Sequence, residues 1–139
     1  MPYPSKYQNA GRDFDQFMDD AKNELGFESR HMAYTTVQSV FQVFRCRISV
    51  QHALDFASHL PAVIGAIFVS DWKISGEAVP FADMATMNDE VKQLRKDHNF
   101  SPDNAIQCVA SVLWRHVDQA EMKKVLSLMP PEAASFWEC

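Results

Sequence analysis

The chain has 139 residues, of which 47% are hydrophobic and 22% charged, and its formal net charge is −5. This composition is typical of one globular domain and not of a disordered chain. The negative charge argues against nucleic acid and an anionic membrane surface as partners, and we expect neither. The longest apolar run, residues 61–69, is far shorter than the ~18 residues of a membrane-spanning helix.

The cysteines indicate a reducing compartment. Cys46, Cys108 and Cys139 are odd in number, widely spaced and without a Cys-x-x-Cys pair. They therefore do not form a disulfide framework, and the sequence shows no signal peptide at its start. We expect a cytoplasmic protein.

Apolar residues at helical spacing predict a single all-helical domain over residues 13–139, preceded by an irregular segment, residues 1–12. Asp13 is the expected N-cap of the first helix, and Gly26 is its stop. Ser29 and Ser49 are the expected caps of the next two. The expected inward-facing residues are Phe14, Phe17, Met18, Ala21 and Leu25, then Ala33, Val37, Val40, Phe41 and Phe44, then Val50, Ala53, Leu54 and Ala57.

Pro61 ends the third helix and suits the first turn of a short fourth one, residues 62–69. Residues 73–80 read as a connection, after which the pattern restarts. Asp83 and Asp118 are expected caps, and Ser101 followed by Pro102 predicts another helix start. A last short helix opens at Pro130 and ends near residue 137.

The two halves of the chain are similar. An offset of 73 residues aligns Phe27 with Phe100, and an offset of 69 aligns Pro61 with Pro130 and Phe68 with Trp137. We interpret them as two pseudo-repeated units of about four helices each, residues 13–72 and 83–137, packed as one bundle. Both Phe68 and Trp137 are then expected to be buried.

Several motifs are similar to those of a known family. The opening helix reads FxxFMxxA, a Leu-Pro pair closes the third helix, and an aliphatic run ends in FVSDWK. The chain resembles the bacterial family named domain of unknown function 2267 over most of its length, from Phe14 to Trp137. The second Leu-Pro pair is replaced by Met129-Pro130, a near-isosteric change. The resemblance implies a helical bundle and no activity. The residues that carry it in the central run are Leu60, Pro61, Phe68 and Trp72.

One helix face carries metal-ligand residue types. His52, Asp55 and His59 lie at i, i+3 and i+7, so they share a face that can approach a metal ion or form a base and its orienting partner. The alternative is a solvated polar face of an amphipathic helix, which we favour because three residues alone make a weak site.

Other polar groups give weaker signals. Arg30, Arg45 and Arg47 are a candidate basic patch, but for Arg45 and Arg47 we favour cations that complement a helix C-terminus. Cys108 and His116 are eight residues apart, too far for a catalytic pair within one helix. Phosphate-binding loops, nucleophile elbows and zinc-protease motifs are missing from the sequence, so we expect no catalytic residues and no cofactor.

We therefore expect a non-enzymatic interaction module that binds a protein partner or itself. Trp72, Ile74, Met32 and Met122 lie off the main apolar stripes and are the interface candidates. The alternative is a protein that binds a metal or a small ligand, or an enzyme, and uses the face of His52, Asp55 and His59.

Overall fold

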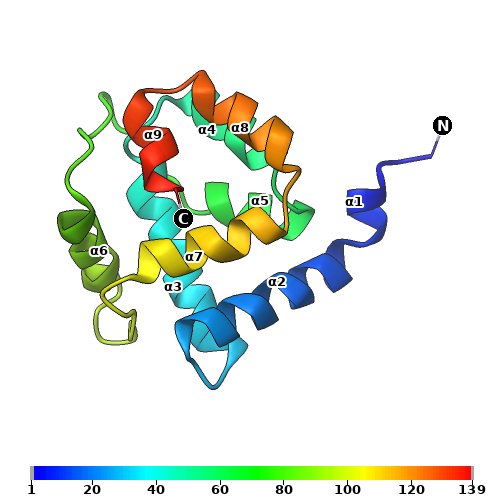
Figure 1. The fold of residues 1–139 in the computed structure, drawn as a ribbon, viewed down its shortest axis with the longest axis horizontal. Coiled ribbons are helices and arrows are strands. Elements are labelled where there is room, and N and C mark those ends of the chain that lie inside the picture. Colours follow the sequence, from blue (N-terminus) through cyan, green and yellow to red (C-terminus); the bar gives the residue numbers. More distant parts are fainter. Residues whose placement is uncertain (1, 139) are drawn as a thin grey trace.

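The computed structural model describes residues 2–138, so Cys139 lies outside the described residues. Within them all regular structure is helical, in nine helices without a strand, which confirms the predicted all-α bundle (Figure 1). The helices are α1 (Ser5–Gln8), α2 (Ala10–Leu25), α3 (Arg30–Arg45), α4 (Val50–Ser58), α5 (Ala62–Val69), α6 (Met84–Gln93), α7 (Ala105–Arg115), α8 (Gln119–Ser127) and α9 (Pro131–Phe136).

Most helix boundaries follow the predicted caps. Ser29 accepts a hydrogen bond from the Met32 amide, and Asp83 and Asp118 cap α6 and α8 in the same way. Gly26 ends α2 with φ 74°, a left-handed conformation that glycine adopts without steric cost. The segment between α5 and α6 contains no regular element, as expected of residues 73–80.

The N-terminal segment is more ordered than expected. Residues 1–12 were expected to be irregular, but Ser5–Gln8 form α1 and α2 begins at Ala10. Pro4 precedes the first turn of α1, and proline suits a helix start because the missing N–H is not needed there. No residue of α1 is buried, so an apolar stripe could not reveal this helix.

The expected start of α7 at Ser101-Pro102 is wrong, because the helix begins at Ala105. The Ser101 hydroxyl is used elsewhere: it bonds to the side chain of Asn99 and lies 2.7 Å from the Thr36 hydroxyl of α3. A buried serine with tertiary partners cannot also cap a helix.

The buried face of α4 also differs from the prediction. Ala53 and Phe56 are fully buried, whereas Val50 and Leu54 are 37% and 48% exposed. Phe56 determines which face of α4 is turned inward, because its ring packs in the core at 5.1 Å from the ring of Phe44. A large aromatic side chain buries more apolar area than valine and leucine at the rim.

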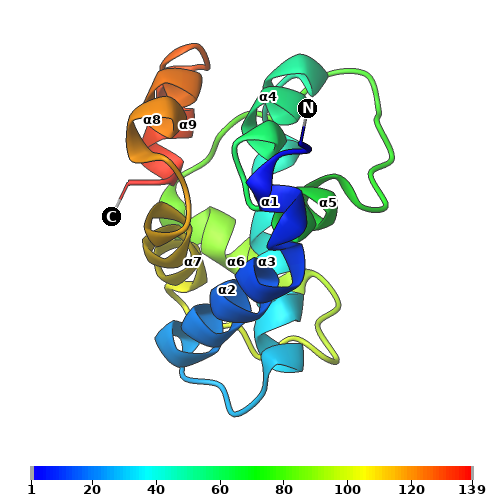
Figure 2. The ribbon, with the colours of Figure 1, turned by 90° about the vertical axis from the view of Figure 1, so that its right-hand side faces the viewer.

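The helices before and after the linker interleave. α2 packs against both α3 and α7, α3 also contacts α6, and α4 lies beside α8 (Figures 1 and 2). The core therefore takes apolar residues from both halves of the chain. Four helices precede the linker after α1 and four follow it, but the superposition of the two units stays a prediction.

An aromatic cluster lies at the centre of the core. Phe68 and Trp137 are both fully buried, as predicted. Trp137 stacks on Phe56 at 5.4 Å, and Phe68 meets the edge of Phe41 at 5.2 Å. None of the helices within residues 2–138 has the length and apolar character needed to cross a membrane.

Candidate binding groove

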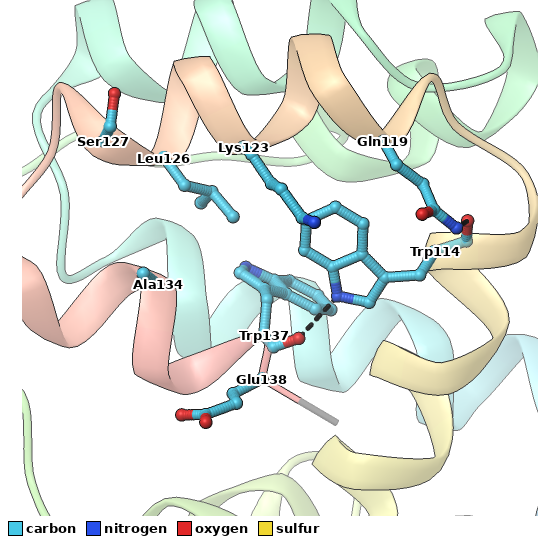
Figure 3. Close-up of a pocket in the computed structure, with 8 residues that line it drawn as sticks. All are labelled: Trp114, Gln119, Lys123, Leu126, Ser127, Ala134, Trp137 and Glu138. Atoms are coloured by element: carbon cyan, nitrogen blue, oxygen red, sulfur yellow. Dashed lines mark hydrogen bonds between the residues drawn. The ribbon is translucent and has the colours of Figure 1, made fainter.

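A groove of about 550 Å³ opens between α8 and α9, against the end of α7 (Figure 3). A cavity of this size falls within the range of ligand-binding clefts, about 300–1,000 Å³. Trp137 and Leu126 are buried beneath it, whereas Trp114 is half-buried at its side. The lining residues are Trp114, Gln119, Lys123, Leu126, Ser127, Ala134, Trp137 and Glu138.

Two tryptophans shape the apolar part of the groove. The indole nitrogen of Trp114 donates a hydrogen bond to the backbone oxygen of Trp137. The indole nitrogen of Trp137 is buried and has no partner among residues 2–138. Figure 3 shows it on the ring edge nearest to Leu126 and Ala134. An unpaired buried donor costs about 1–3 kcal/mol, and this one lies beneath the surface of the groove.

Opposite charges stand on the groove's rim. Lys123 extends from α8 and Glu138 follows α9, and both are exposed. Ser127 is the one hydroxyl among the described lining residues, and it donates to the Lys124 carbonyl of its own helix at 2.6 Å. The groove thus combines an apolar floor with a charged edge and lacks an activated nucleophile.

The predicted metal face lies elsewhere, on α4. His59 Nδ1 is 2.8 Å from the backbone oxygen of Asp55, and the Asp55 carboxylate accepts a hydrogen bond from Gln51. His52 is half-buried on the preceding turn. Among the residues that the structure describes, no three His, Cys, Asp or Glu side chains are grouped to hold a metal ion.

The three arginines of the candidate basic patch bond to different partners in different parts of the fold. Arg30 is exposed and pairs with Asp19 through two hydrogen bonds of 2.7 and 2.8 Å, which lower the pKa of the Asp19 carboxyl. Arg45, only 5% exposed, donates to the carbonyls of Phe68 and Ser70 where α5 ends. Burial lowers the pKa of the Arg45 guanidinium.

Arg47 is also 5% exposed, and it bonds to Glu90 of α6 at 2.6 Å. It donates further to the Val43 carbonyl near the end of α3, the helix that it follows, at 2.8 Å. Arg45 and Arg47 thus join segments of the fold, so the interpretation as cations that complement a helix C-terminus is incomplete. Their side chains hold the ends of α3, α5 and α6 together.

The cysteines within residues 2–138 are free thiols in half-buried positions. Desolvation raises the pKa of both Cys46 and Cys108. The thiolate is the reactive form, so a raised pKa makes each a poor nucleophile at neutral pH.

The predicted interface residues do not line the groove. Trp72 is half-buried and its ring lies 5.4 Å from the Arg45 guanidinium, beside the 62% exposed Ile74. Met32 is half-buried on α3. Met122 is fully buried, so its side chain is not accessible on the folded surface.

The groove residues were missed because they were read as core. Trp137 is indeed buried, but it also forms the floor of an open cavity. The predicted repeat offers one signal, at two positions where an apolar residue of the first predicted unit is replaced by a charged one in the second. At the offset of 69, Leu54 becomes Lys123 and Val69 becomes Glu138.

Comparisons with known proteins agree with the motifs of the sequence. Residues 14–136 match a protein family described as "Uncharacterized conserved protein (DUF2267)". No curated protein matches the chain. The family match runs from α2 to the end of α9 and includes six of the eight lining residues of the groove, but not Trp137 and Glu138.

Proposed function

The chain belongs to the DUF2267 family, whose description names no activity, and we propose that it is a non-enzymatic helical module that binds a protein partner through the groove between α8 and α9. One observation carries the proposal: the half-buried Trp114 stands beside an open, largely apolar groove with a charged rim, over the buried ring of Trp137. Tryptophan is enriched at the energetic centres of protein interfaces, and polar residues surround such centres.

The chemistry of the groove favours binding over catalysis. A nucleophile needs an adjacent base, whereas the Ser127 hydroxyl is committed to its own helix backbone. Lys123 and Glu138 are exposed at the rim, where they are placed to meet charged groups of a partner.

The test is affinity capture from the native host, read by mass spectrometry, with three forms of the full chain. Ala134 is exposed in the groove, so Ala134→Trp fills the cavity without disturbing the core. Ser135 is the next exposed residue on α9 and does not line the groove, so Ser135→Trp is the matched control. We expect the wild type and the control to retain the same protein and Ala134→Trp to lose it.

Equal capture by all three forms would contradict the proposal. Metal analysis of the purified protein is a second check. Stoichiometric zinc or iron would favour the alternative, a metal site on the face of His52, Asp55 and His59.

A further inference from the structure

One buried arginine has no carboxylate partner among residues 2–138. Arg45 is only 5% exposed, and its three hydrogen bonds all go to backbone carbonyls. Arg47 is equally buried, but it bonds to the Glu90 carboxylate at 2.6 Å. A buried charge is costly unless an opposite charge compensates it. Within the described part of the chain, Arg45 therefore lacks the anion that Arg47 has.

Backbone carbonyls hold the Arg45 guanidinium in place. Its Nη1 atom donates to the carbonyls of Phe68 and Ser70 at 2.9 and 2.7 Å, and Nη2 lies 3.4 Å from the Asp71 carbonyl. The Cζ atom lies over the Trp72 ring, 5.4 Å from its centroid. The side chain is thus fixed before any ligand arrives, which reduces the entropy that binding costs.

One edge of this guanidinium is left free. Its Nε–H donates to no described residue, and Nη2 makes only the long contact with Asp71. The same edge of Arg30 donates to both carboxylate oxygens of Asp19, at 2.7 and 2.8 Å. Paired bonds of this kind are the preferred geometry of arginine with a carboxylate. Within residues 2–138 the one enclosed side-chain donor without a partner is the Trp137 indole nitrogen, so the Arg45 Nε is not sealed inside the protein.

A cavity of about 320 Å³ adjoins Arg45. It lies between the end of α3, the start of α4 and residues 72–79, which Figure 2 shows as an open loop beside α4. Its volume lies at the lower end of the range of ligand-binding clefts, about 300–1,000 Å³. Arg45 lines the cavity, whereas Phe68, Ser70 and Asp71 do not. A ligand there would therefore meet the free edge of the guanidinium and not its carbonyl partners.

The wall of this cavity combines apolar surface with an excess of positive charge. Large apolar side chains line it, namely Ile48, Val50, Trp72, Ile74 and Val79. Arg45 and Lys73 outnumber the single acidic side chain among the described lining residues, Glu77, although the whole chain has a net charge of −5. Such a wall suits a ligand that has an anionic head and an apolar body.

We infer that this cavity binds a small carboxylic acid with an apolar body, whose carboxylate accepts hydrogen bonds from Nε and Nη2 of Arg45. The acid can be a free molecule or the C-terminal end of a peptide, because both present the same carboxylate. Its apolar part packs against Trp72 and Ile74. The site is separate from the α8/α9 groove and does not depend on the proposed function.

The experiment follows the arginine Nε–H and tryptophan indole signals in NMR spectra of the isotope-labelled full chain. Four probes are titrated at pH 7. Hexanoate has the carboxylate and an apolar body, and hexanamide has the same shape without the charge. Inorganic phosphate has the charge without the apolar body. An acetylated glycyl-leucine dipeptide with a free carboxylate represents the end of a peptide.

We expect hexanoate to shift the signals of Arg45 and Trp72, and hexanamide to bind about tenfold more weakly. Phosphate should also bind more weakly than hexanoate, because it gains nothing from the apolar wall. The dipeptide should bind as an acid as well, and the tighter of the two acids identifies a peptide end or a free molecule as the source. Arg45→Lys keeps the charge and loses the paired donors, so hexanoate affinity should fall about tenfold.

Two further tests leave Arg45 unchanged, so they remain decisive if Arg45→Lys does not fold. Asp71 has φ 54°, and its negative charge acts on Arg45. Asp71→Asn removes this charge and keeps a residue that tolerates the left-handed conformation, so hexanoate should bind about two- to fivefold more tightly. Ile74 is 62% exposed at the cavity. Ile74→Glu should bind hexanoate about two- to fivefold more weakly than its matched control, Ile74→Lys.

Contrary results would overturn separate parts of the inference. Equal binding of hexanoate and hexanamide would overturn the carboxylate pair with Arg45, as would unchanged hexanoate binding by Arg45→Lys or equal binding by the two Ile74 variants. Phosphate binding as tight as that of hexanoate would overturn the apolar body. If neither acid shifts the signals of Arg45 and Trp72, the inference fails as a whole.

Discussion

The Trp114 indole nitrogen donates a hydrogen bond of 2.6 Å to the backbone oxygen of Trp137. This bond connects the end of α7 to the end of α9, across the cavity that α8 closes from the other side (Figure 3). It therefore fixes the position of a half-buried ring relative to a fully buried one. The bond holds the Trp114 ring at the side of the groove, whereas ring contacts with Phe44 and Phe56 hold Trp137.

Trp114→Phe removes this donor and keeps an aromatic ring. We expect the free energy of unfolding to fall by about 0.5–1.5 kcal/mol, the usual net contribution of one hydrogen bond. Capture of a partner should weaken as well, because the groove wall is no longer fixed. Urea denaturation measures the first effect. An unchanged unfolding midpoint would show that the bond contributes nothing to stability.

Alanine at Gly65 and alanine at Gly11 should have opposite effects. At Gly65 the new Cβ meets the Ala57 carbonyl oxygen at 2.8 Å, so helices α4 and α5 must move apart. We expect a loss of about 1–3 kcal/mol. Gly11 lies within α2 with no neighbour near its Cβ position, and Gly11→Ala should stabilise by about 0.5–1 kcal/mol. Thermal unfolding of both variants checks the sign of each change.

Substitution by alanine should reduce the free energy of unfolding much more at Phe68 than at Leu54. Phe68 is fully buried, and Phe68→Ala is expected to cost about 3–5 kcal/mol through the cavity it leaves. Leu54 was expected in the core but is 48% exposed, so Leu54→Ala should cost much less, about 1 kcal/mol. Chemical denaturation of the pair provides the comparison. Similar losses would argue against the orientation of α4 described above.

The interface prediction for Trp72 and Ile74 stays a prediction, and Trp72→Ala tests it. The ring lies over the Arg45 guanidinium, so the variant should lose about 0.5–2 kcal/mol of stability. We expect it to weaken any self-association of the chain and to leave capture through the α8/α9 groove unchanged. Sedimentation analysis and denaturation, measured separately, distinguish the two effects. A stability loss with unchanged association would mean that Trp72 only supports the fold.

The stability of the folded chain should fall at high pH because of the two described thiols. Burial raises the pKa of Cys46 and Cys108 in the folded chain. The folded state therefore binds these protons more tightly, and its stability should be retained below the ordinary thiol pKa of about 8.5 and lost as the pH rises above it. Alkylation by iodoacetamide should be slow at pH 7 and faster in urea. Rapid alkylation of the folded chain at pH 7 would contradict this assignment.

The sequence was informative wherever a local signal decides the structure. Ser29, Ser49 and Asp83 accept hydrogen bonds from backbone amides near their own positions, so a helix start can be read from a few residues. Ser101 shows the limit of this reasoning. Its hydroxyl faces Thr36, which is 65 positions away in the chain, and such a partner cannot be inferred from the neighbouring sequence.

The site was harder to predict than the fold. Groove residues such as Leu126 and Trp137 have the same apolar spacing as ordinary core residues. What makes them a candidate site is that α7, α8 and α9 leave an open groove above them, which is a tertiary relationship. Likewise, the partners of Arg45 are backbone carbonyls at the end of α5. Every residue has a backbone carbonyl, so the residue types at this position could not reveal the contact.

The place of α9 in the aromatic cluster has a consequence during synthesis of the protein. Phe44 and Phe56 leave the ribosome long before Phe136 and Trp137, the rings that pack on them at 4.9 and 5.4 Å. Until then the nascent chain presents unburied aromatic surface, which chaperones recognise. A product of premature termination before α9 keeps that surface exposed and becomes a target for proteases. This cluster can therefore be buried only after Trp137 has been synthesised and has left the ribosome.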